Sequence, residues 1–337
     1  MPNLRLSILD QSPVPEGYSE GDALRNTIDL ARLADRLGYT RYWVAEHHGT
    51  PGLACHSPEV MIGPIAAATS RLRVGSGGVM LPHYSPLKVA ETFSMLSGLF
   101  PGRIDPGVGR AAGGSPSIAI ALQRDRRHAA PDDFHEQLDE LLSLLSNRPP
   151  DEGPFAQLGS VHFTSPDVWL LGSSQESAVW AAERGLPYVF AAFLHPHGEL
   201  IARCYREQFR PSRLSETPRL GVALGAICAE TDTEAERLSF SFRMMMATRF
   251  RGQSGPVPTV ERAARFLAGE GLAESHTADR QMITGTPARV REAIEAVTRD
   301  YKAEEVFIVN IMHDHGARRR SYELIAGEFG LGLEQDG

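Results

Sequence analysis

The chain contains few cysteines, and their placement excludes a disulfide framework. Three cysteines, Cys55, Cys204 and Cys228, are spread over 337 residues. An odd number at wide spacing forms neither a set of crosslinks nor a CxxC pair that binds a metal or cycles between thiol and disulfide. We therefore expect a protein of a reducing compartment, and we predict that it is cytoplasmic.

Long apolar segments and an excess of positive charge are also missing. The longest uncharged apolar segment, residues 220–229, has about half the length of a membrane-spanning helix. The sequence does not open with a basic segment followed by an apolar block, so no secretory signal is predicted. The 34 basic residues are outnumbered by 42 acidic ones, and the net charge of −8 argues against nucleic acids and anionic membranes as partners.

The chain does contain a regular alternation of short apolar segments with amphipathic helical segments. Strands are expected at residues 4–9, 41–45, 72–75, 103–108, 168–171, 188–190, 220–228 and 305–309. Helix starts are marked by Ser57-Pro58, Ser85-Pro86 and Thr286-Pro287. Eight strand–helix units are what a (β/α)8 barrel requires, whereas an open doubly wound sheet rarely repeats so evenly. We predict an α/β protein with one TIM-barrel domain over residues 1–337.

Two segments interrupt the alternation. Residues 111–130, between the fourth strand and its helix, are rich in glycine, serine and proline and then in arginine. Residues 250–284 come after the seventh strand and its helix, and glycine and proline gather near their start. Long insertions in compact barrels usually have a function. We predict that residues 250–284 form a mobile lid, helical between residues 260 and 268.

The ends of the second and third strands carry residues suited to chemistry, and in a barrel the strand ends form the active site. Glu46, His47 and His48 follow the second strand. They could act as metal ligands, as a general acid/base pair or as a polar plug. Gly77 and Gly78 follow the third strand. Their lack of side chains either leaves room for a flat ligand against the backbone or permits a tight bend.

The ends of the fourth and fifth strands carry residues that could hold a phosphate. Arg110 follows the fourth strand, and the helix after the fifth begins with Ser173, Ser174 and Ser177. Hydroxyl groups and free N–H groups at a helix start bind phosphate well. Serine is also an ordinary helix cap, and an exposed arginine is common, so both interpretations stay open. The glycines near Arg110 do not match the GxGxxG dinucleotide fingerprint.

Two HxH motifs suggest a further alternative, the metal site of a barrel hydrolase. His195 and His197 follow the sixth strand, and His313 and His315 follow the eighth. Such hydrolases place their HxH motif on the first strand, which here has no histidine. We therefore predict no metal site.

Taken together, these segments resemble the bacterial-luciferase-like flavin monooxygenases. The match runs in order from about residue 4 to about residue 330, and resembles most the single-chain enzymes of actinomycete polyketide tailoring. It is carried by LDQSP at residues 9–13, RYWVAEHH at 41–48, RVGSGGVMLPH at 73–83, KVAE at 88–91, GRID at 102–105 and WLLGSS at 169–174.

The resemblance implies a (β/α)8 barrel that binds FMN, with the deazaflavin F420 as the alternative cofactor. His47 corresponds to the histidine beside the reactive face of the flavin. Gly77 and Gly78 correspond to the small residues behind its ring system, which luciferases join through a cis peptide bond. The residues at or beside the flavin phosphate would be Arg110, Ser173, Ser174 and Ser177.

The resemblance also implies the reaction. Reduced FMN would react with O2 to give a C4a-(hydro)peroxyflavin, which hydroxylates or epoxidises a small organic substrate, such as an antibiotic or polyketide intermediate. We expect His47, with a pKa near neutrality, to set the protonation state of this peroxide. Because no NAD(P)H fingerprint is visible, we predict a separate reductase that supplies reduced FMN. A homodimer through the second and third helices is expected, and the alternatives are an F420-dependent oxidoreductase and a non-catalytic flavin-binding relative.

Overall fold

A computed structural model describes residues 4–110, 116–123, 126–127, 132–147, 166–272 and 282–332. All ladders between its named strands are parallel. The strands are β1 Arg5–Asp10, β2 Arg41–Val44, β3 Arg73–Ser76, β4 Val79–Met80, β5 Ile104–Asp105, β6 Gly107–Gly109, β7 Trp169–Gly172, β8 Tyr188–Ala191, β9 Leu220–Cys228, β10 Met282–Gly285 and β11 Glu305–Val309.

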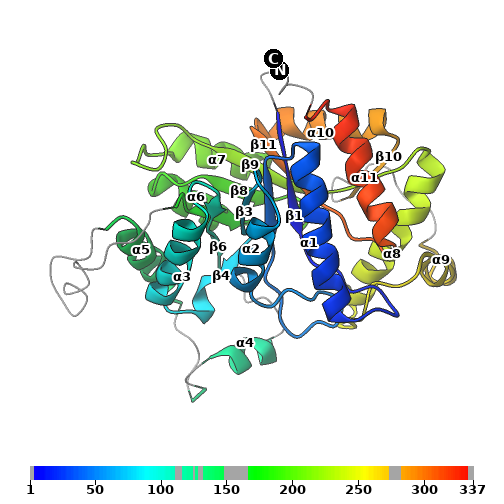
Figure 1. Cartoon of the computed structure of the whole chain (residues 1–337), viewed down its shortest axis with the longest axis horizontal. Coiled ribbons are helices and arrows are strands. Elements are labelled where there is room, and N and C mark those ends of the chain that lie inside the picture. The colour runs from blue at the N-terminus through cyan, green and yellow to red at the C-terminus, as the bar shows by residue number, and fades with distance from the viewer. Residues whose placement is uncertain are drawn as a thin grey trace.

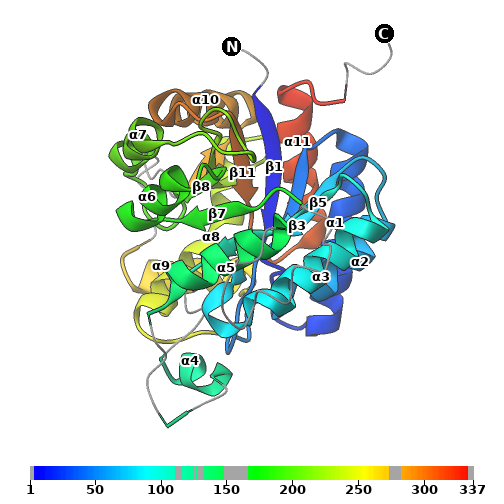
Figure 2. The same ribbon diagram turned by 90° about the vertical axis from the view of Figure 1, so that its left-hand side faces the viewer.

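Helices surround this sheet on its outside (Figures 1 and 2). Their starts follow the cap signals of the sequence, with proline in the first turn of α2, α3 and α10. The helices are α1 Glu20–Leu37, α2 Pro58–Ala67, α3 Pro86–Leu99, α4 Pro116–Leu122, α5 Phe134–Leu145, α6 Gln175–Glu183, α7 Glu199–Gln208, α8 Asp232–Phe250, α9 Val260–Gly269, α10 Pro287–Tyr301 and α11 His315–Glu328, with a short 3-10 turn η1 at Leu81–His83.

The sheet closes on itself through a fourth strand that is divided in two. The strand order is β4-β6-β7-β8-β9-β11-β1-β2-β3-β5, and β5 and β6 are consecutive segments of the chain. β5 pairs with β3, and β6 pairs with β7. The predicted (β/α)8 barrel is therefore confirmed. Because its strands are parallel, their carboxyl ends all lie at one end of the barrel, where the predicted site residues are found.

Pro106 is the point at which the fourth strand divides. The sequence predicts one strand over residues 103–108, whereas the structure has Ile104–Asp105 and Gly107–Gly109 on either side of Pro106. Proline has no N–H to donate to a ladder. Its carbonyl still accepts a hydrogen bond of 2.9 Å from the Trp169 N–H. The division lets one segment of chain pair with β3 and the next with β7.

The segment 250–284 contains a strand that the sequence pattern does not predict. Met282–Gly285 forms β10 and pairs with the last four residues of β9, Gly225 to Cys228. The predicted helix is present as α9, Val260–Gly269. Val257 is fully buried and exchanges backbone hydrogen bonds of 2.8 Å with Val14 and Glu16, which lie between β1 and α1. This part of the segment is thus tied to the barrel, while residues 273–281 lie outside the described residues.

The barrel interior is filled by large aromatic side chains. Trp43, Trp169 and Phe307 come from three different strands, and each is at most 1% exposed. The Trp43 ring lies 4.4 Å from that of Phe307 and 5.3 Å from that of Trp169, measured between centroids. Such packing leaves the barrel without an open channel. A ligand can therefore reach only the loops beyond the strand ends.

Candidate active site

His47 lies directly after β2, and its imidazole is largely buried. Its backbone N–H donates a hydrogen bond of 2.9 Å to the carbonyl of Cys55, which fixes the loop. The Nδ1 atom is buried without a hydrogen-bond partner among the described residues. Burial first, and then the positive charge of Arg249, lower the pKa of His47 to about 4. The expectation of a near-neutral pKa is therefore wrong, because a charged imidazole would lose its hydration there without gaining an anionic partner.

Glu46 joins the end of β2 to the segment that follows β3. It is 1% exposed, and its Oε2 atom accepts a hydrogen bond of 2.9 Å from the Met80 N–H. The Oε1 atom accepts one of 2.9 Å from the Tyr84 hydroxyl and lies 2.7 Å from His48 Nε2. The sequence places Glu46 beside two histidines but gives no sign of its other partners, which lie more than 30 residues away. Glu46 thus positions the segments that carry His47 and Gly78.

Replacing Glu46 by glutamine should loosen this junction. The amide keeps the shape of the side chain but loses the charge that its three donors share, so we expect a loss of about 1–2 kcal/mol in the free energy of unfolding. Denaturant unfolding measures it, with Glu91→Gln on the exposed face of α3 as the control. Equal stability of Glu46→Gln and the unmodified protein would contradict this role.

Gly77 and Gly78 lie between β3 and β4, and the peptide bond between them is cis. A Cβ atom on Gly77 would overlap Leu9 Cδ1, and one on Gly78 would lie 2.8 Å from the Gly107 carbonyl oxygen. Backbone atoms of the neighbouring strand therefore require glycine at position 78, whereas a Cβ atom on Gly77 would displace the Leu9 side chain. The Gly77 N–H donates a hydrogen bond of 2.8 Å to the Val44 carbonyl, which places this turn beside the end of β2.

Arg110 follows β6 and is held over a tryptophan that the sequence pattern does not single out. Its guanidinium carbon lies 4.9 Å from the centroid of the Trp180 ring on α6. The side chain is exposed, and its charge also acts on Glu176 in the first turn of the same helix. Stacking of this kind orients a guanidinium while leaving its N–H groups available to an anion. Trp180, from a separate segment of the chain, thus holds the Arg110 guanidinium beside α6.

The three serines around the start of α6 have different surroundings. Ser174 is the N-cap residue, and its hydroxyl accepts a hydrogen bond of 3.4 Å from the Ser177 N–H. Ser177 is 6% exposed, and its hydroxyl donates to the Ser174 carbonyl at 2.8 Å and lies 2.9 Å from the Tyr188 hydroxyl. Ser173 is half-buried in the turn before the helix. Ser173 and Ser174 are thus the members best placed to meet a ligand, whereas Ser177 has its partners inside the protein.

The structure brings the predicted site residues to the ends of neighbouring strands. The order β2-β3-β5, continued by β6-β7, places His47, the Gly77–Gly78 turn, Arg110 and the serines in sequence around one side of the barrel mouth. A single elongated ligand could contact all of them. Its flat part would lie near His47, and an anionic end would lie near Arg110 and the start of α6, where helix N–H groups favour negative charge.

The two HxH motifs differ in their surroundings. His313 Nε2 lies 3.0 Å from the carbonyl oxygen of Glu16, and His315 Nε2 lies 2.9 Å from Asp29 Oδ2. His195 and His197 are exposed. Within the part of the chain that the structure describes, no three histidine, cysteine or acidic side chains are grouped as metal ligands. A barrel metallohydrolase is therefore not supported by the described residues.

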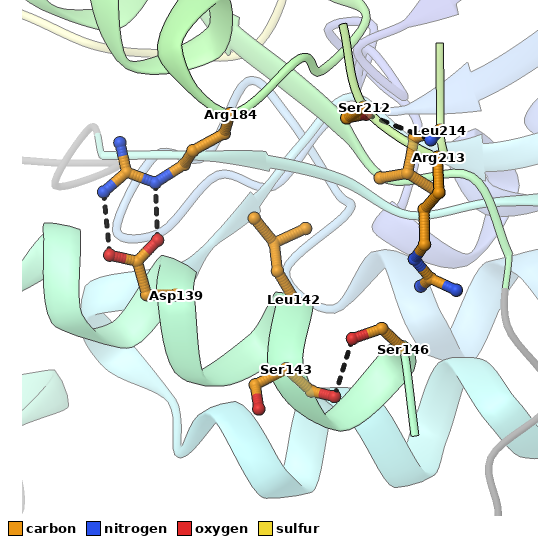
Figure 3. A pocket seen from close by; sticks show the side chains of 8 residues that line it. All are labelled: Asp139, Leu142, Ser143, Ser146, Arg184, Ser212, Arg213 and Leu214. Carbon is orange, nitrogen blue, oxygen red and sulfur yellow. Dashed lines mark hydrogen bonds and ion pairs between the residues drawn. The ribbon is translucent and has the colours of Figure 1, made fainter. Parts of the chain in front are cut away.

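A groove at the opposite end of the barrel is lined by α5, Arg184 and the segment between α7 and β9 (Figure 3). Arg184 follows α6, and its guanidinium pairs with Asp139 at 2.6 Å. These residues precede the amino ends of strands, so the groove is separate from the site at the carboxyl ends.

None of the described helices is long and apolar enough to cross a bilayer.

Comparison with known proteins identifies close relatives over the whole chain. The sequence model of a family described as luciferase-like monooxygenase matches residues 4–302. The Bacillus subtilis protein YwcH, which is uncharacterized, is 45% identical over 96% of this chain and 98% of its own length. The N-acetyl-S-alkylcysteine monooxygenase of the same organism is 36% identical over 96% of this chain and 97% of its own length. The crystal structure of apo-MsnO8 is 39% identical, with a TM-score of 0.88 and 98% of each chain covered.

More distant solved structures share the fold and bind two kinds of cofactor. The oxygenating component of 3,6-diketocamphane monooxygenase from Pseudomonas putida, solved with FMN, has a TM-score of 0.71 at 20% identity, with 98% of this chain and 99% of that chain covered. An F420-dependent secondary alcohol dehydrogenase has a TM-score of 0.62 at 15% identity, with 97% and 99% covered. These similarities extend to the fold alone, and a flavin and a deazaflavin are both compatible with it.

Proposed function

Since the chain belongs to the luciferase-like monooxygenase family and is an enzyme of that class, we propose that it uses reduced FMN and O2 to oxygenate a small organic substrate. The observation that carries this proposal is the row of groups at four neighbouring strand ends. At one end of this row lies an imidazole whose buried Nδ1 atom has no partner in the described part of the chain, and at the other lies a stacked guanidinium beside a helix start.

The described residues offer the positive charge and the helix start that the phosphate of FMN would need. Arg110, Ser173 and Ser174 would hold its phosphate, and the turn at Gly77–Gly78 would lie against its ring system. When bound, reduced FMN would supply the electrons that activate O2, by the C4a-(hydro)peroxyflavin route that the resemblance implies. His47 is neutral at pH 7, so it offers a hydrogen bond or takes a proton near the reacting oxygen rather than acting as a permanent imidazolium.

Exclusion of water from this site is assigned to residues 250–284. We propose that they act as a lid on a single-domain protein, as the sequence predicts. The described part supports this position, because α9 packs on α8 and Val257 is paired with the segment between β1 and α1. A closed site protects reactive intermediates from water and strengthens the electrostatic contacts inside it.

The test of the function is to bind photoreduced FMN to the protein without oxygen, admit air and record absorbance. A near-ultraviolet band that is distinct from oxidised FMN and decays slowly supports a monooxygenase. Reoxidation at the rate of free FMN, together with tighter binding of reduced F420 than of reduced FMN, would favour the F420-dependent alternative. Tight binding of oxidised FMN with no oxygen transfer to any substrate would favour a non-catalytic binder.

A separate flavin reductase and a cytoplasmic location complete the proposal. The purified protein with added FMN should oxidise NADH and NADPH no faster than a protein-free mixture, and rapid oxidation would contradict the need for a reductase. The three cysteines are unpaired, which supports a reducing compartment.

For the substrate we propose an antibiotic or polyketide intermediate, with an N-acetyl-S-alkylcysteine as the second candidate because of the 36% identical relative.

We further propose a homodimer through α2 and α3, which lie side by side (Figure 2). Three large apolar side chains on their outer faces are strongly exposed: Val60 at 66%, Met95 at 68% and Leu99 at 69%. An outward apolar surface of this kind is typical of a protein–protein interface. The position agrees with the contact that the family resemblance implies.

A double substitution of Met95 and Leu99 by glutamate should separate the subunits. Two charges in an apolar interface must be dehydrated without partners, so we expect the dimer dissociation constant to rise at least about tenfold. Sedimentation velocity over a range of protein concentrations measures it. Leu200→Glu, at a 78% exposed position on α7, is the control and should leave the assembly unchanged. A monomeric unmodified protein would contradict the proposal.

A further inference from the structure

One face of α8 is turned toward the barrel mouth. Phe242, Met245, Met246 and Arg249 follow one another at the spacing i, i+3, i+4 and i+7, which places them on a single stripe of the helix. Phe242 belongs to the buried cluster that also contains Leu9 at the end of β1, and the two methionines pack against that cluster while remaining partly exposed. The stripe therefore runs across the carboxyl ends of the strands.

Arg249 is the exposed end of this stripe. Among the described residues, its guanidinium forms neither a hydrogen bond nor an ion pair. The other arginines on or directly after α8 are all engaged: Arg237 with Glu234 at 2.8 Å, Arg251 with Glu270 at 2.5 Å, and Arg243 with the Leu272 carbonyl. A positive charge in the last turn of a helix interacts favourably with the helix dipole. That effect does not require Arg249 to lie on the face that packs against the barrel.

Arg249 lies within electrostatic range of the imidazole that follows β2. Its charge reaches His47, and His48 and His56 lie next to that imidazole. The carboxylate of Glu46, the residue before His47, is already bound by three donors. An unpaired cation thus stands beside the partly exposed apolar wall of Met245 and Met246, with no anion of the described protein to neutralise it. Methionine adapts its shape to varied apolar ligands, and arginine binds carboxylates with directed, charge-assisted hydrogen bonds.

We propose that the substrate of this enzyme is an amphiphilic organic anion, with an apolar body on Met245 and Met246 and a carboxylate or similar acidic group on Arg249. This inference rests on the proposed function, because it assigns the substrate side of the same site. The phosphate of the cofactor is assigned to Arg110 and α6, beyond the ends of β6 and β7. Arg249 acts instead at the β2 side, next to His47, and so selects the substrate that is presented to that residue.

The experiment uses two probes of equal shape, 4-phenylbutyrate and its uncharged amide, and the full-length flavin-free protein. Calorimetry or ligand-observed NMR measures the dissociation constant of each. The unmodified protein should bind the acid at least about tenfold more tightly than the amide. Arg249→Met should abolish that preference, because the thioether keeps apolar contact and loses the charge. Arg251→Met, two residues further on and paired with Glu270 in the parent protein, should keep it.

Several results would overturn the inference. Equal affinity for both probes, binding of neither probe, or a preference that survives Arg249→Met would each show that Arg249 does not select an acidic substrate. A weaker affinity of Arg249→Met for reduced FMN, with the acid preference intact, would assign the arginine to the cofactor. Since these measurements need no turnover, they are independent of the air-admission experiment. Failure of that experiment with the acid preference retained would contradict the proposed function alone.

Discussion

Oxygen transfer should fall by roughly 100- to 10,000-fold when His47 is replaced by alanine, which is the range expected for the loss of one positioned acid–base group. Binding of FMN should change little, because the phosphate is assigned to the other end of the site. The imidazole is buried at the end of β2, and its Nδ1 atom has no partner to lose among the described residues. Stopped-flow absorbance after mixing the reduced complex with oxygen, followed by product analysis, measures both quantities.

The matched control is His195→Ala, since His195 is exposed in the segment between β8 and α7. It should leave both oxygen transfer and FMN binding unchanged. Unaltered turnover in His47→Ala would contradict the assigned role. A loss of FMN binding in step with turnover would instead show that His47 acts mainly by holding the cofactor.

The lowered pKa of His47 makes the free energy of unfolding depend on pH. Burial, with the nearby charge of Arg249, lowers that pKa from 6.5 to about 4 in the folded protein. Between these values the unfolded chain binds a proton that the folded protein does not. The free energy of unfolding is therefore undiminished by this group above pH 6.5. It falls by roughly 3 kcal/mol as the pH is lowered to about 4. His47→Gln should flatten the dependence of the free energy of unfolding on pH in this range.

Arg110→Ala is expected to weaken FMN binding by about 1.5–3 kcal/mol, or roughly 10- to 150-fold, and riboflavin binding hardly at all. The two ligands differ only in the phosphate, so the difference isolates the contact with the guanidinium. Stacking on Trp180 at 4.9 Å orients that group before a ligand arrives. Fluorescence titration of both ligands into the unmodified and substituted proteins measures the effect.

Arg184→Ala provides the comparison for Arg110, because Arg184 lies at the other end of α6 and pairs with Asp139 away from the strand ends (Figure 3). It should leave the affinity for FMN and riboflavin unchanged. Equal losses for the two ligands in Arg110→Ala would place this arginine elsewhere than at the phosphate. A smaller loss in Arg110→Lys would show that charge contributes even without the planar stack.

The repeating strand–helix pattern and the order of the polar residues at the strand ends can be predicted from the sequence. Both follow from local chemistry: the apolar period reports which side of an element is buried, and the proline and serine signals mark where helices begin. The placement of His47 after β2 and of Arg110 after β6 therefore follows from the order of residues along the chain. Parallel strands then guarantee that these ends lie at one end of the barrel.

The surroundings of those residues depend instead on the tertiary fold. The division of the fourth strand at Pro106 and the pairing of β10 with β9 depend on which segments become neighbours. Glu46 receives its donors, Arg110 its tryptophan and His47 the charge of Arg249 from parts of the chain that are remote in sequence. Burial and electrostatic fields are properties of the assembled interior, so the lowered pKa of His47 and the unpaired state of Arg249 among the described residues emerge only when the chain is folded.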